Sequence, residues 1–372
     1  MSTDKPVVVY GVSGYTGRLI CEYLRELGVP FVAAGRDAER VREVVEKIPG
    51  IETADYEVIG VENTAAALAE AFDGAQVICN TAGPFIKFGP EVVEAALQIG
   101  AHYTDTTGEQ DWVLAARDKW GEKFAEKDLL LAPGIAHMYT TSEIAANIAL
   151  EPGGYDTLDI LVLWKGLPTY ASTQTIFTIL KADWYYLEQN KLVEWDHLSA
   201  FNVSVPGYHE QGVAVPWGGM SHPIWFQNDP RVSSVRAIGG VFDRAVMNGV
   251  ADTVKMFEEQ IRPLEPAAQE EALANIAASL QAGMPPRENA RINRSIDSVH
   301  ASGPLGRSHV VIHGNSNYKQ TGLLQAFAAF SLIQQRPDRV GFASGCQAFG
   351  YRELLGQLRG FGLVAEPIVT RV

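Results

Sequence analysis

Cysteine and basic residues are scarce in this sequence of 372 residues. Its three cysteines, Cys21, Cys79 and Cys346, lie far apart and form no C-x-x-C pair. This spacing argues against a disulfide framework and predicts buried, reduced thiols in a cytoplasmic protein. Lysine and arginine number 30 against 44 acidic residues, and the resulting net charge of −14 argues against binding to a nucleic acid backbone.

Long apolar runs and metal-ligand patterns are missing too. The longest apolar helical stretch, residues 322–333, is too short to span a bilayer, and no secretory signal pattern opens the chain. Among the eight histidines, His309 and His313 lie four apart in SHVVIHG. That segment is typical of a strand, with no third ligand near, so no metal site is expected.

Apolar residues make up 47% of the chain and charged residues 20%, which is enough for a large core. The length is comfortable for two domains, and no low-complexity linker or internal repeat interrupts it.

The segment VVVYGVSGYTGRLICEYL, residues 7–24, has the pattern of a buried strand, a glycine turn and a helix. Gly11 would let the chain reverse, Gly14 would leave room for a pyrophosphate, and Gly17 would let the helix lie close to the strand. Phosphates bind at the N–H groups that open such a helix. The predicted phosphate loop therefore consists of Gly11, Ser13, Gly14, Tyr15, Thr16 and Gly17. A tight turn without a ligand is the alternative.

The end of the second predicted strand bears on the choice of cofactor. Residues 29–34 are apolar and are followed by Gly35, Arg36 and Asp37. An acidic residue here holds the ribose 2′-hydroxyl of NAD, whereas an arginine accommodates the 2′-phosphate of NADP. Because Arg36 comes first, we favour NADP, while Asp37 keeps NAD possible. Arg36 could instead be a solvated charge at a helix start.

Residues 1–135 alternate between strand and helix patterns, which predicts a Rossmann domain, a doubly wound parallel sheet with its ligands at the strands' carboxyl ends. The expected strands are 7–10, 31–34, 56–60, 75–80, 102–105 and 129–132, and the expected helices are 16–27, 38–48, 63–72, 90–99 and 111–127.

A different pattern begins near residues 151–154, and we expect a mixed α+β second domain over residues 136–335. Residues 336–372 should pack back on the first domain. The expected strands are 157–164, 200–205, 232–241 and 299–312, the last with a hairpin at GPLG, and the expected helices are 251–261, 266–282, 321–335 and 351–359. Five of the seven tryptophans fall between residues 164 and 225, which fits a core, a pocket for a bulky substrate, or a dimer interface.

Three stretches resemble the saccharopine dehydrogenase-like oxidoreductases, a family that includes trans-acting enoyl reductases. They are GVSGYTGRLICEYL with the following AAGRD, the run NTAGPFIKFGPEVVEAALQIGAHYTDTTGEQDW over residues 80–112, and APGIAHM over residues 132–138. The resemblance is strong over about the first 145 residues and weaker in SGPLGRSHVVIHG and the helix after it. It implies an NAD(P)-binding Rossmann domain followed by an α+β domain for substrate binding and dimerisation.

The resemblance also implies site residues. The residues expected beside the nicotinamide ribose are Thr81, Ala82, Gly83, Pro84 and Phe85. Glu109 follows the fifth strand, where a carboxylate is placed for proton transfer, although it could instead cap a helix. His137 at the domain junction is a candidate proton donor because histidine titrates near neutral pH, and Tyr139 is a second. The alternatives are that His137 is structural and that hydride transfer in this family needs no protein acid, because the nicotinamide carries the chemistry.

The sequence departs from saccharopine chemistry in its second domain. An amino-acid substrate with several carboxylates needs arginines, yet the expected pocket segment is aromatic and has none before Arg231. The family's Ser-Gly-Gly-Thr helix start is matched only loosely at Ser172, which could cap that helix. We therefore expect an apolar or aromatic substrate with a reducible C=C, C=O or C=N bond, contacted by Trp164, Tyr170 and Ser172. An amino-acid-derived imine is the alternative.

Two other classes of Rossmann-fold enzyme require residues that this sequence lacks. No tyrosine has a lysine four residues later, as a short-chain dehydrogenase requires, and no cysteine is placed as the nucleophile of an acyl-phosphate reductase. A non-catalytic NADP sensor or scaffold, like the NmrA-type regulators, remains possible because fold does not fix function. The sequence predicts a cytoplasmic, homodimeric NADP-dependent oxidoreductase with a small-molecule substrate and no nucleic acid or membrane partner.

Overall fold

The computed structural model describes residues 3–166, 168–279 and 284–371. The chain divides into two compact units, each assembled from separate segments. Unit 1 comprises Met1–Thr107, Trp112–Thr140 and Tyr318–Phe361, and unit 2 comprises Gly108–Asp111, Thr141–Asn317 and Gly362–Val372.

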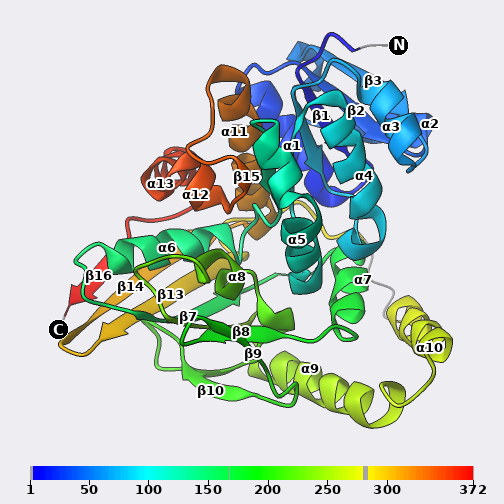
Figure 1. Ribbon diagram of the computed structural model, residues 1–372. Helices are drawn as coiled ribbons and strands as arrows, with labels where there is room; N and C mark the ends of the chain where they lie inside the picture. Colours follow the sequence, from blue (N-terminus) through cyan, green and yellow to red (C-terminus); the bar gives the residue numbers. More distant parts are fainter. Residues whose placement is uncertain (1–2, 167, 280–283, 372) are drawn as a thin grey trace. The chain divides into compact units, whose positions relative to one another are not determined.

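Unit 1 contains a seven-stranded sheet whose strands are all parallel, as Figure 1 shows in blue and cyan for its first part. Its order is β15-β6-β5-β4-β1-β2-β3. The strands are β1 (Val7–Tyr10), β2 (Phe31–Gly35), β3 (Tyr56–Gly60), β4 (Val77–Asn80), β5 (His102–Asp105), β6 (Leu130–Ala132) and β15 (Gly341–Phe342). The chain changes direction across the sheet between β1 and β4, which is the switch point of a Rossmann fold. The predicted doubly wound α/β domain is confirmed.

Helices cover both faces of this sheet. They are α1 (Tyr15–Glu26), α2 (Ala38–Val45), α3 (Ala65–Phe72), α4 (Phe85–Ile99), α5 (Gln110–Glu126), α11 (Asn317–Gln334), α12 (Gly345–Phe349) and α13 (Tyr351–Gly360), with a 3-10 turn η1 at Ile51–Thr53. On one face, Phe72, Val92 and Trp112 from α3, α4 and α5 join a buried cluster with β1, β2 and β4. On the other, α11 lies against α1 so closely that a Cβ on Gly322 would be 2.8 Å from Leu19 Cβ.

Helix α4 begins earlier than the sequence predicts. Proline favours the first turn of a helix, which places the expected start at Pro90. The helix instead starts at Phe85, directly after the N-cap Pro84, and carries Pro90 inside it. This early start brings the opening of α4 next to the end of β4.

Unit 2 is built on a mixed sheet in the order β16-β14-β13-β7-β12-β8-β9. The strands are β7 (Thr157–Trp164), β8 (Tyr185–Glu188), β9 (Lys191–Glu194), β12 (Ser234–Val241), β13 (Arg294–Gly303), β14 (Gly306–Asn315) and β16 (Ile368–Arg371). Among the neighbouring strands described in this sheet, the pair β7 and β12 is parallel and the other pairs are antiparallel. The β13–β14 hairpin turns at the predicted GPLG, with Gly303 opposite Gly306. A mixed second domain is confirmed, although β8, β9 and β16 were not expected.

The remaining elements of unit 2 are a small hairpin and short helices. They are β10 (Phe201–Ser204), β11 (Gln211–Ala214), α6 (Thr140–Leu150), α7 (Tyr170–Ile179), η2 (Trp217–Gly219), α8 (His222–Phe226), α9 (Arg244–Met256), the π-helical turn η3 (Phe257–Ile261) and α10 (Pro266–Ser279). The end of the expected helix 266–282 lies outside the described residues. Four tryptophans of the aromatic segment are buried, Trp164, Trp184, Trp195 and Trp225, and two of them, Trp184 and Trp195, belong to a core cluster.

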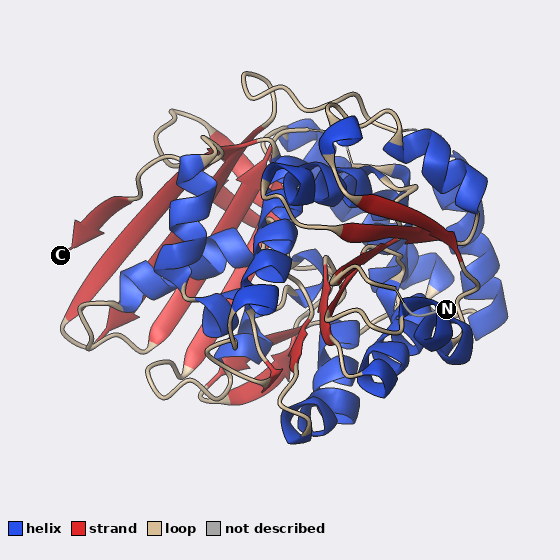
Figure 2. Cartoon of the chain, turned by 90° about the horizontal axis from the view of Figure 1, so that it is seen from above, coloured by secondary structure: helices blue, strands red, loops and turns tan. Residues whose placement is uncertain are grey.

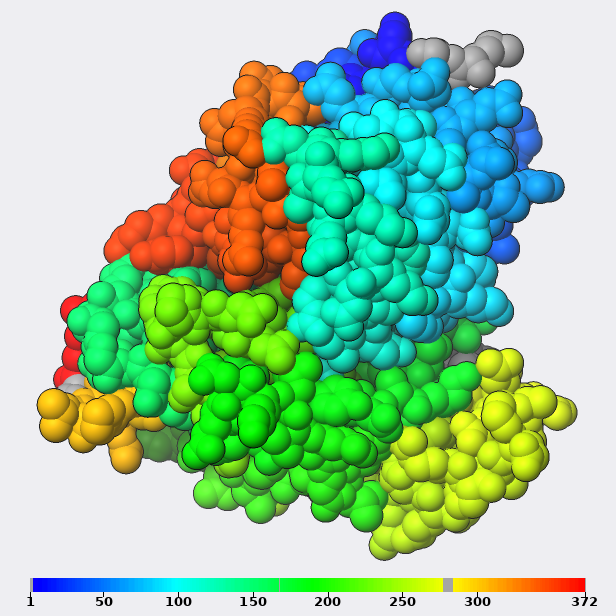
Figure 3. Space-filling view, in the orientation of Figure 1, coloured from blue at the N-terminus to red at the C-terminus, as the bar shows by residue number. Residues whose placement is uncertain are grey.

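The C-terminal part of the chain serves both units. Sequence analysis placed residues 321–335 in the second domain and 336–372 with the first. In the structure α11, α12 and α13 belong to unit 1. A Cβ on Gly121 of α5 would lie 3.2 Å from Phe342 Cβ of β15, and Figure 3 shows the orange part of the chain beside the teal part that contains α5. The last strand, β16, pairs with β14 of unit 2, beside the long strands seen in Figure 2. A short edge strand with little apolar pattern gives no local signal of its partner.

All three cysteines are buried thiols that take no part in a disulfide. Burial raises the pKa of Cys79 to about 12, as expected for an unreactive core thiol. None of the helices among the described residues is both long and apolar enough to cross a membrane.

Candidate functional site: the carboxyl edge of the first sheet

The turn between β1 and α1 adopts the geometry that its glycines predict. Gly11 has a φ of +94°, and a Cβ there would lie 2.6 Å from Thr81 Oγ1. A Cβ on Gly17 would lie 2.7 Å from Val12 Cα, so only glycine lets α1 approach the strand this closely. The backbone of Gly14 is extended, with a φ of −79°, a conformation that any residue can adopt. The turn therefore does not require glycine at this position, but the missing side chain leaves space beside the turn.

The N-terminus of α1 is open to an anion. Its N-cap is Gly14, which provides no side-chain hydrogen bond, and its first turn has no acidic residue. The helix dipole and the N–H groups of this turn favour a negative charge here.

Arg18 adds a positive charge in the same turn of α1, and the sequence analysis did not single it out. Its Nη2 is buried without a hydrogen-bond partner among the described residues. Its guanidinium lies 5.7 Å from the centre of the Tyr15 ring, and burial lowers its pKa. A buried guanidinium nitrogen without an acceptor suits an anionic ligand. The signal in the sequence was its position directly after Gly17.

The two residues after β2 have separate roles. The Asp37 carboxylate accepts a hydrogen bond from the backbone N–H of Arg40 at 3.1 Å and so caps α2. Arg36 is exposed. Since the carboxylate is engaged by the helix, the charge available to a ligand at the end of β2 is the positive one of Arg36.

The segment after β4 lies directly beside the glycine turn. Thr81 donates through its backbone N–H and its Oγ1 to the carbonyl oxygen of Tyr10, at 2.8 and 2.9 Å. The Ala82 N–H donates to Asn80 Oδ1 at 2.9 Å, and the Gly83–Pro84 peptide is cis. Phe85 is buried at the start of α4. All predicted cofactor residues therefore belong to unit 1, and residues 11 and 81 are in close proximity.

A buried polar network joins the carboxyl ends of β4 and β5. Asn80 Nδ2 donates to Tyr103 Oη at 3.0 Å, and Tyr103 Oη donates to Asp105 Oδ2 at 2.9 Å. Asp105 also accepts from Trp112 Nε1 at 2.8 Å and from the N–H groups of Thr107 and Gly134, both at 2.9 Å. Burial outweighs these bonds and raises the pKa of Asp105 to about 6.

Gln325 of α11 completes this network, and no local sequence signal marks it. Its Nε2 donates to the carbonyl oxygens of Asp105 at 2.6 Å and Ile135 at 2.9 Å. Its Oε1 accepts from Thr104 Oγ1 at 2.7 Å. The glutamine therefore fixes the end of β5 and the segment after β6 to a helix that lies 190 to 221 residues later in the chain.

The candidate catalytic residues are all buried but belong to different units. His137 and Tyr139 are in unit 1, and Glu109 is in the short segment of unit 2. Burial lowers the pKa of His137 to about 3, so its imidazole is neutral at pH 7, and its backbone N–H donates to Thr321 Oγ1 at 3.0 Å. Thr175 Oγ1 of α7 donates to Glu109 Oε1 at 3.4 Å.

The three candidate substrate residues lie in unit 2. Trp164 ends β7, and its Nε1 is buried without an acceptor among the described residues. Tyr170 opens α7 and is 53% exposed. The expectation that Ser172 caps this helix is wrong: the N-cap is Thr169, whose Oγ1 accepts from the Ser172 N–H at 3.0 Å. Ser172 is already inside the first turn, where its side chain cannot serve as the N-cap.

Two family models match successive parts of the chain. Residues 7–125 match the family described as "Saccharopine dehydrogenase NADP binding domain". The chain is 34% identical over 149 residues to a Caenorhabditis elegans "Lipid droplet localized protein", covering 38% of this chain and 35% of that protein. It is 36% identical over 115 residues to the "Trans-acting enoyl reductase" of Mycobacterium leprae, covering 29% and 27%. The matches thus span about a third or less of these relatives' lengths.

A solved structure shares the fold over nearly the whole chain. Apo saccharopine dehydrogenase (L-Glu forming) from Saccharomyces cerevisiae superposes with a TM-score of 0.64, covering 98% of this chain and 100% of that one. The sequence identity is 12%, so this likeness concerns the fold alone. The predicted resemblance to saccharopine dehydrogenase-like proteins and the NADP-binding type of the first domain are confirmed. Residues 140–372 match the "Family of unknown function (DUF5938)", and over this larger part of its length the chain belongs to that family.

Proposed function

We propose that this protein is an NADP-dependent oxidoreductase that reduces a small apolar or aromatic substrate. The observation that carries the proposal is the open N-terminus of α1 with the buried Nη2 of Arg18 beside it. Arg18 and the N–H groups of α1 would hold the pyrophosphate. Arg36 would hold the 2′-phosphate, because Asp37 caps α2 and is engaged there. Residues 81–85 would line the nicotinamide ribose with backbone rather than long side chains.

When bound, the nicotinamide supplies the hydride. The protein's part is to orient the substrate and to place a proton. Glu109, held by Thr175, is our candidate for the proton, and the neutral imidazole of His137 would act as a hydrogen-bonding group rather than as a charged acid. The buried indole N–H of Trp164 is available to a polar atom of the substrate.

Titration with NADPH and with NADH, followed by nicotinamide fluorescence, tests the proposal. We expect NADPH to bind more tightly, with enhanced and blue-shifted emission from a dry site. Apolar enones, ketones and imines would then be screened for NADPH oxidation. Binding without turnover of any of these would favour the sensor alternative. Failure to bind either nucleotide would contradict the proposal.

Reversing the charge of Arg36 is expected to change cofactor preference. In Arg36→Glu, NADPH affinity should fall by about tenfold or more, because a charge-assisted contact with the 2′-phosphate is replaced by repulsion, while NADH affinity should change less than about threefold. Arg42→Glu is the matched control, since Arg42 is an exposed arginine on α2, the helix that follows Arg36, and pairs with Glu39 at 2.7 Å. Equal effects of both variants would assign the 2′-phosphate to another residue.

A side chain at Gly14 is expected to block the cofactor without unfolding the protein. The extended backbone of Gly14 is allowed for any residue, and a Cβ there would lie 3.2 Å from the Gly11 carbonyl oxygen. In Gly14→Val, NADPH affinity should fall by about tenfold or more as the valine occupies the phosphate space. Gly356→Val is the control, because a Cβ at Gly356 meets no atom within 4 Å. Unchanged binding in Gly14→Val would show that the pyrophosphate lies elsewhere.

A further inference from the structure

The β8–β9 hairpin of unit 2 brings three ligand-type side chains together. One ligand atom each from Asp183, Glu194 and His197 lies within 4.8 Å of the other two. The hairpin register explains the grouping. Tyr185 lies opposite Glu194, and the Trp195 N–H donates to the Trp184 carbonyl oxygen at 2.7 Å, so residues 183 and 197 flank the same end of the hairpin.

His197 distinguishes this group from an ordinary surface cluster of acids. Its side chain is only 8% exposed, and its Nε2 is buried with no hydrogen-bond partner among the described residues. Its ring stacks on the indole of Trp184, with centroids 4.3 Å apart and planes 21° apart. A buried, fixed imidazole nitrogen without a partner requires an explanation. The two carboxylates beside it are exposed and can turn toward a ligand.

The other ring nitrogen of His197 is oriented by a carboxylate. Nδ1 lies 2.8 Å from Glu258 Oε1, at the π-helical turn η3. A carboxylate at this distance can accept a hydrogen bond from a proton-bearing Nδ1, which would leave the Nε2 lone pair for a ligand. A carboxylate behind a histidine is the usual outer partner of a metal-ligating imidazole.

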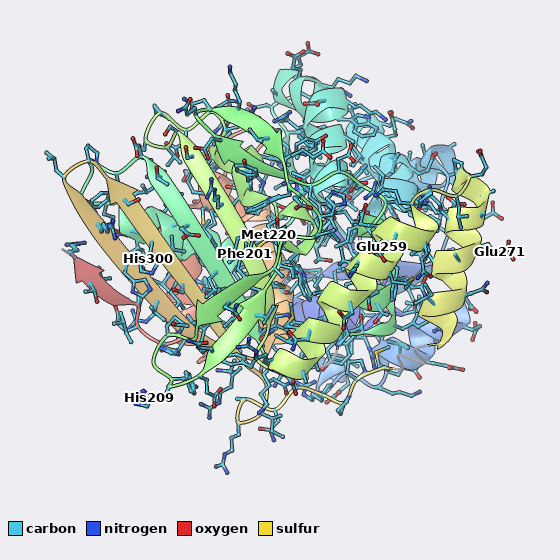
Figure 4. The ribbon with its side chains drawn as sticks, turned by 90° about the horizontal axis from the view of Figure 1, so that it is seen from below. Phe201, His209, Met220, Glu259, Glu271 and His300 are labelled. Atoms are coloured by element: carbon cyan, nitrogen blue, oxygen red, sulfur yellow. The ribbon has the colours of Figure 1, made fainter. Side chains whose placement is uncertain are left out.

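The adjacent Arg262 favours the opposite tautomer, because a guanidinium can only donate, and metal binding at Nε2 would select the tautomer in which Nδ1–H donates to Glu258. Its Nη2 lies 2.7 Å from His197 Nδ1, and its Nε donates to Glu258 Oε2 at 2.7 Å. Glu258 therefore balances the charge of the guanidinium, while Asp183 and Glu194 contribute two negative charges on the hairpin. Figure 4 shows Glu259, the neighbour of Glu258, on a helical segment next to α10, which carries Glu271.

We propose that Asp183, Glu194 and His197 Nε2 bind a divalent transition-metal ion, with zinc as the expected metal. One imidazole and two carboxylates are borderline-to-hard ligands that suit Zn²⁺ and Co²⁺, whereas Mg²⁺ and Ca²⁺ prefer oxygen alone. The ion would join the end of the β8–β9 hairpin through His197 to Glu258 and so to η3. From the sequence no metal site is expected, since His309 and His313 have no third ligand near them. The sequence signal for the present group is Glu194-x-x-His197, two ligand-type residues three positions apart.

Calorimetric titration of the metal-stripped full-length protein with ZnCl₂ tests the site. We expect binding of one ion at micromolar affinity or tighter, and a matching titration with CoCl₂ should give the visible absorption of a low-symmetry site that includes nitrogen. Asp183→Asn combined with Glu194→Gln should weaken Zn²⁺ binding about a hundredfold. These two side chains are exposed, so the variant should fold normally, and circular dichroism would verify this.

Two further variants make the result specific. His197→Gln should weaken Zn²⁺ binding as strongly as the double variant, whereas Glu210→Gln, at an exposed carboxylate outside the group, should leave it unchanged. Quenching of Trp184 emission by Cu²⁺ should follow the same order, because its indole stacks on His197. Absence of Zn²⁺ and Co²⁺ binding to the parent protein, or equal binding by the double variant, would overturn the proposal.

Discussion

Replacing Gln325 with leucine is expected to lower the free energy of unfolding of unit 1 by about 3 kcal/mol, at roughly 1–3 kcal/mol for each buried polar group left without its partner. The leucine would be similar in size but would remove three hydrogen bonds at once. The Ile135 carbonyl oxygen would lose its donor and Thr104 Oγ1 its acceptor, while the Asp105 carbonyl oxygen would keep only the Ile135 N–H.

The measurement is urea denaturation followed by tryptophan emission. Unit 1 contains two tryptophans, Trp112 and Trp120, so a unit-specific signal requires replacing those of unit 2 or following amide exchange of β5. Gln334→Leu, at the exposed end of the same helix, is the control and should change stability by less than about 0.5 kcal/mol. Similar losses in the two variants would mean that the three bonds contribute little beyond helix propensity.

Asp297→Asn is expected to stabilise unit 2 relative to the parent protein by an amount that grows as the pH rises from 5 to 8. Asp297 is fully buried in β13, between Val162 of β7 and Ile312 of β14. Burial raises its pKa from 3.8 to about 8. Between these values the folded protein keeps a proton that the unfolded chain releases. The contribution of Asp297 to the free energy of unfolding is therefore full at low pH. It falls by ~1.4 kcal/mol per pH unit as the pH rises between the two pKa values.

The asparagine resembles the protonated acid and does not titrate, so the pH slope from this position should disappear. The gain relative to the parent protein between pH 5 and pH 8 should approach about 4 kcal/mol at most. Chemical denaturation at both values measures it, with Asp252→Asn, at an exposed position of α9, as the control. A difference between variant and parent that stays constant with pH would show that Asp297 is ionised in the folded protein.

The first unit was predictable because its signals are local. The strand–turn–helix pattern around Gly11 and Gly17 is written in consecutive residues, and buried parallel strands are apolar on both faces. Unit 2 was less predictable. Strand β8 contains mostly half-buried residues, β9 contains mostly exposed ones, and β16 is exposed throughout, so neither the period nor the composition separates them from loops.

The same distinction holds for the candidate site. The glycine turn follows from the sequence because its neighbours along the chain define its geometry. The capping of α2 by Asp37 was not expected, since the sequence suggested only that Asp37 keeps NAD possible, although a carboxylate after a strand fits both a ribose and an N-cap. Gln325 was missed because its partners at residues 104, 105 and 135 are distant in sequence. The low pKa of His137 was missed because burial is not visible in its local pattern.

The interleaved segments of the two units limit how the molecule can be divided. A fragment ending at Thr140 would lose β15, leaving the edge of β6 without its neighbour, and would lose Gln325 from the network at β5. A fragment beginning there would carry α11, α12 and α13 away from the sheet against which they fold. The family match over residues 140–372 therefore covers parts of both folding units. The chain passes from one unit to the other five times, after residues 107, 111, 140, 317 and 361. No single cut therefore separates the two units, and a gene fusion or a domain exchange between relatives would have to keep all segments of a unit together.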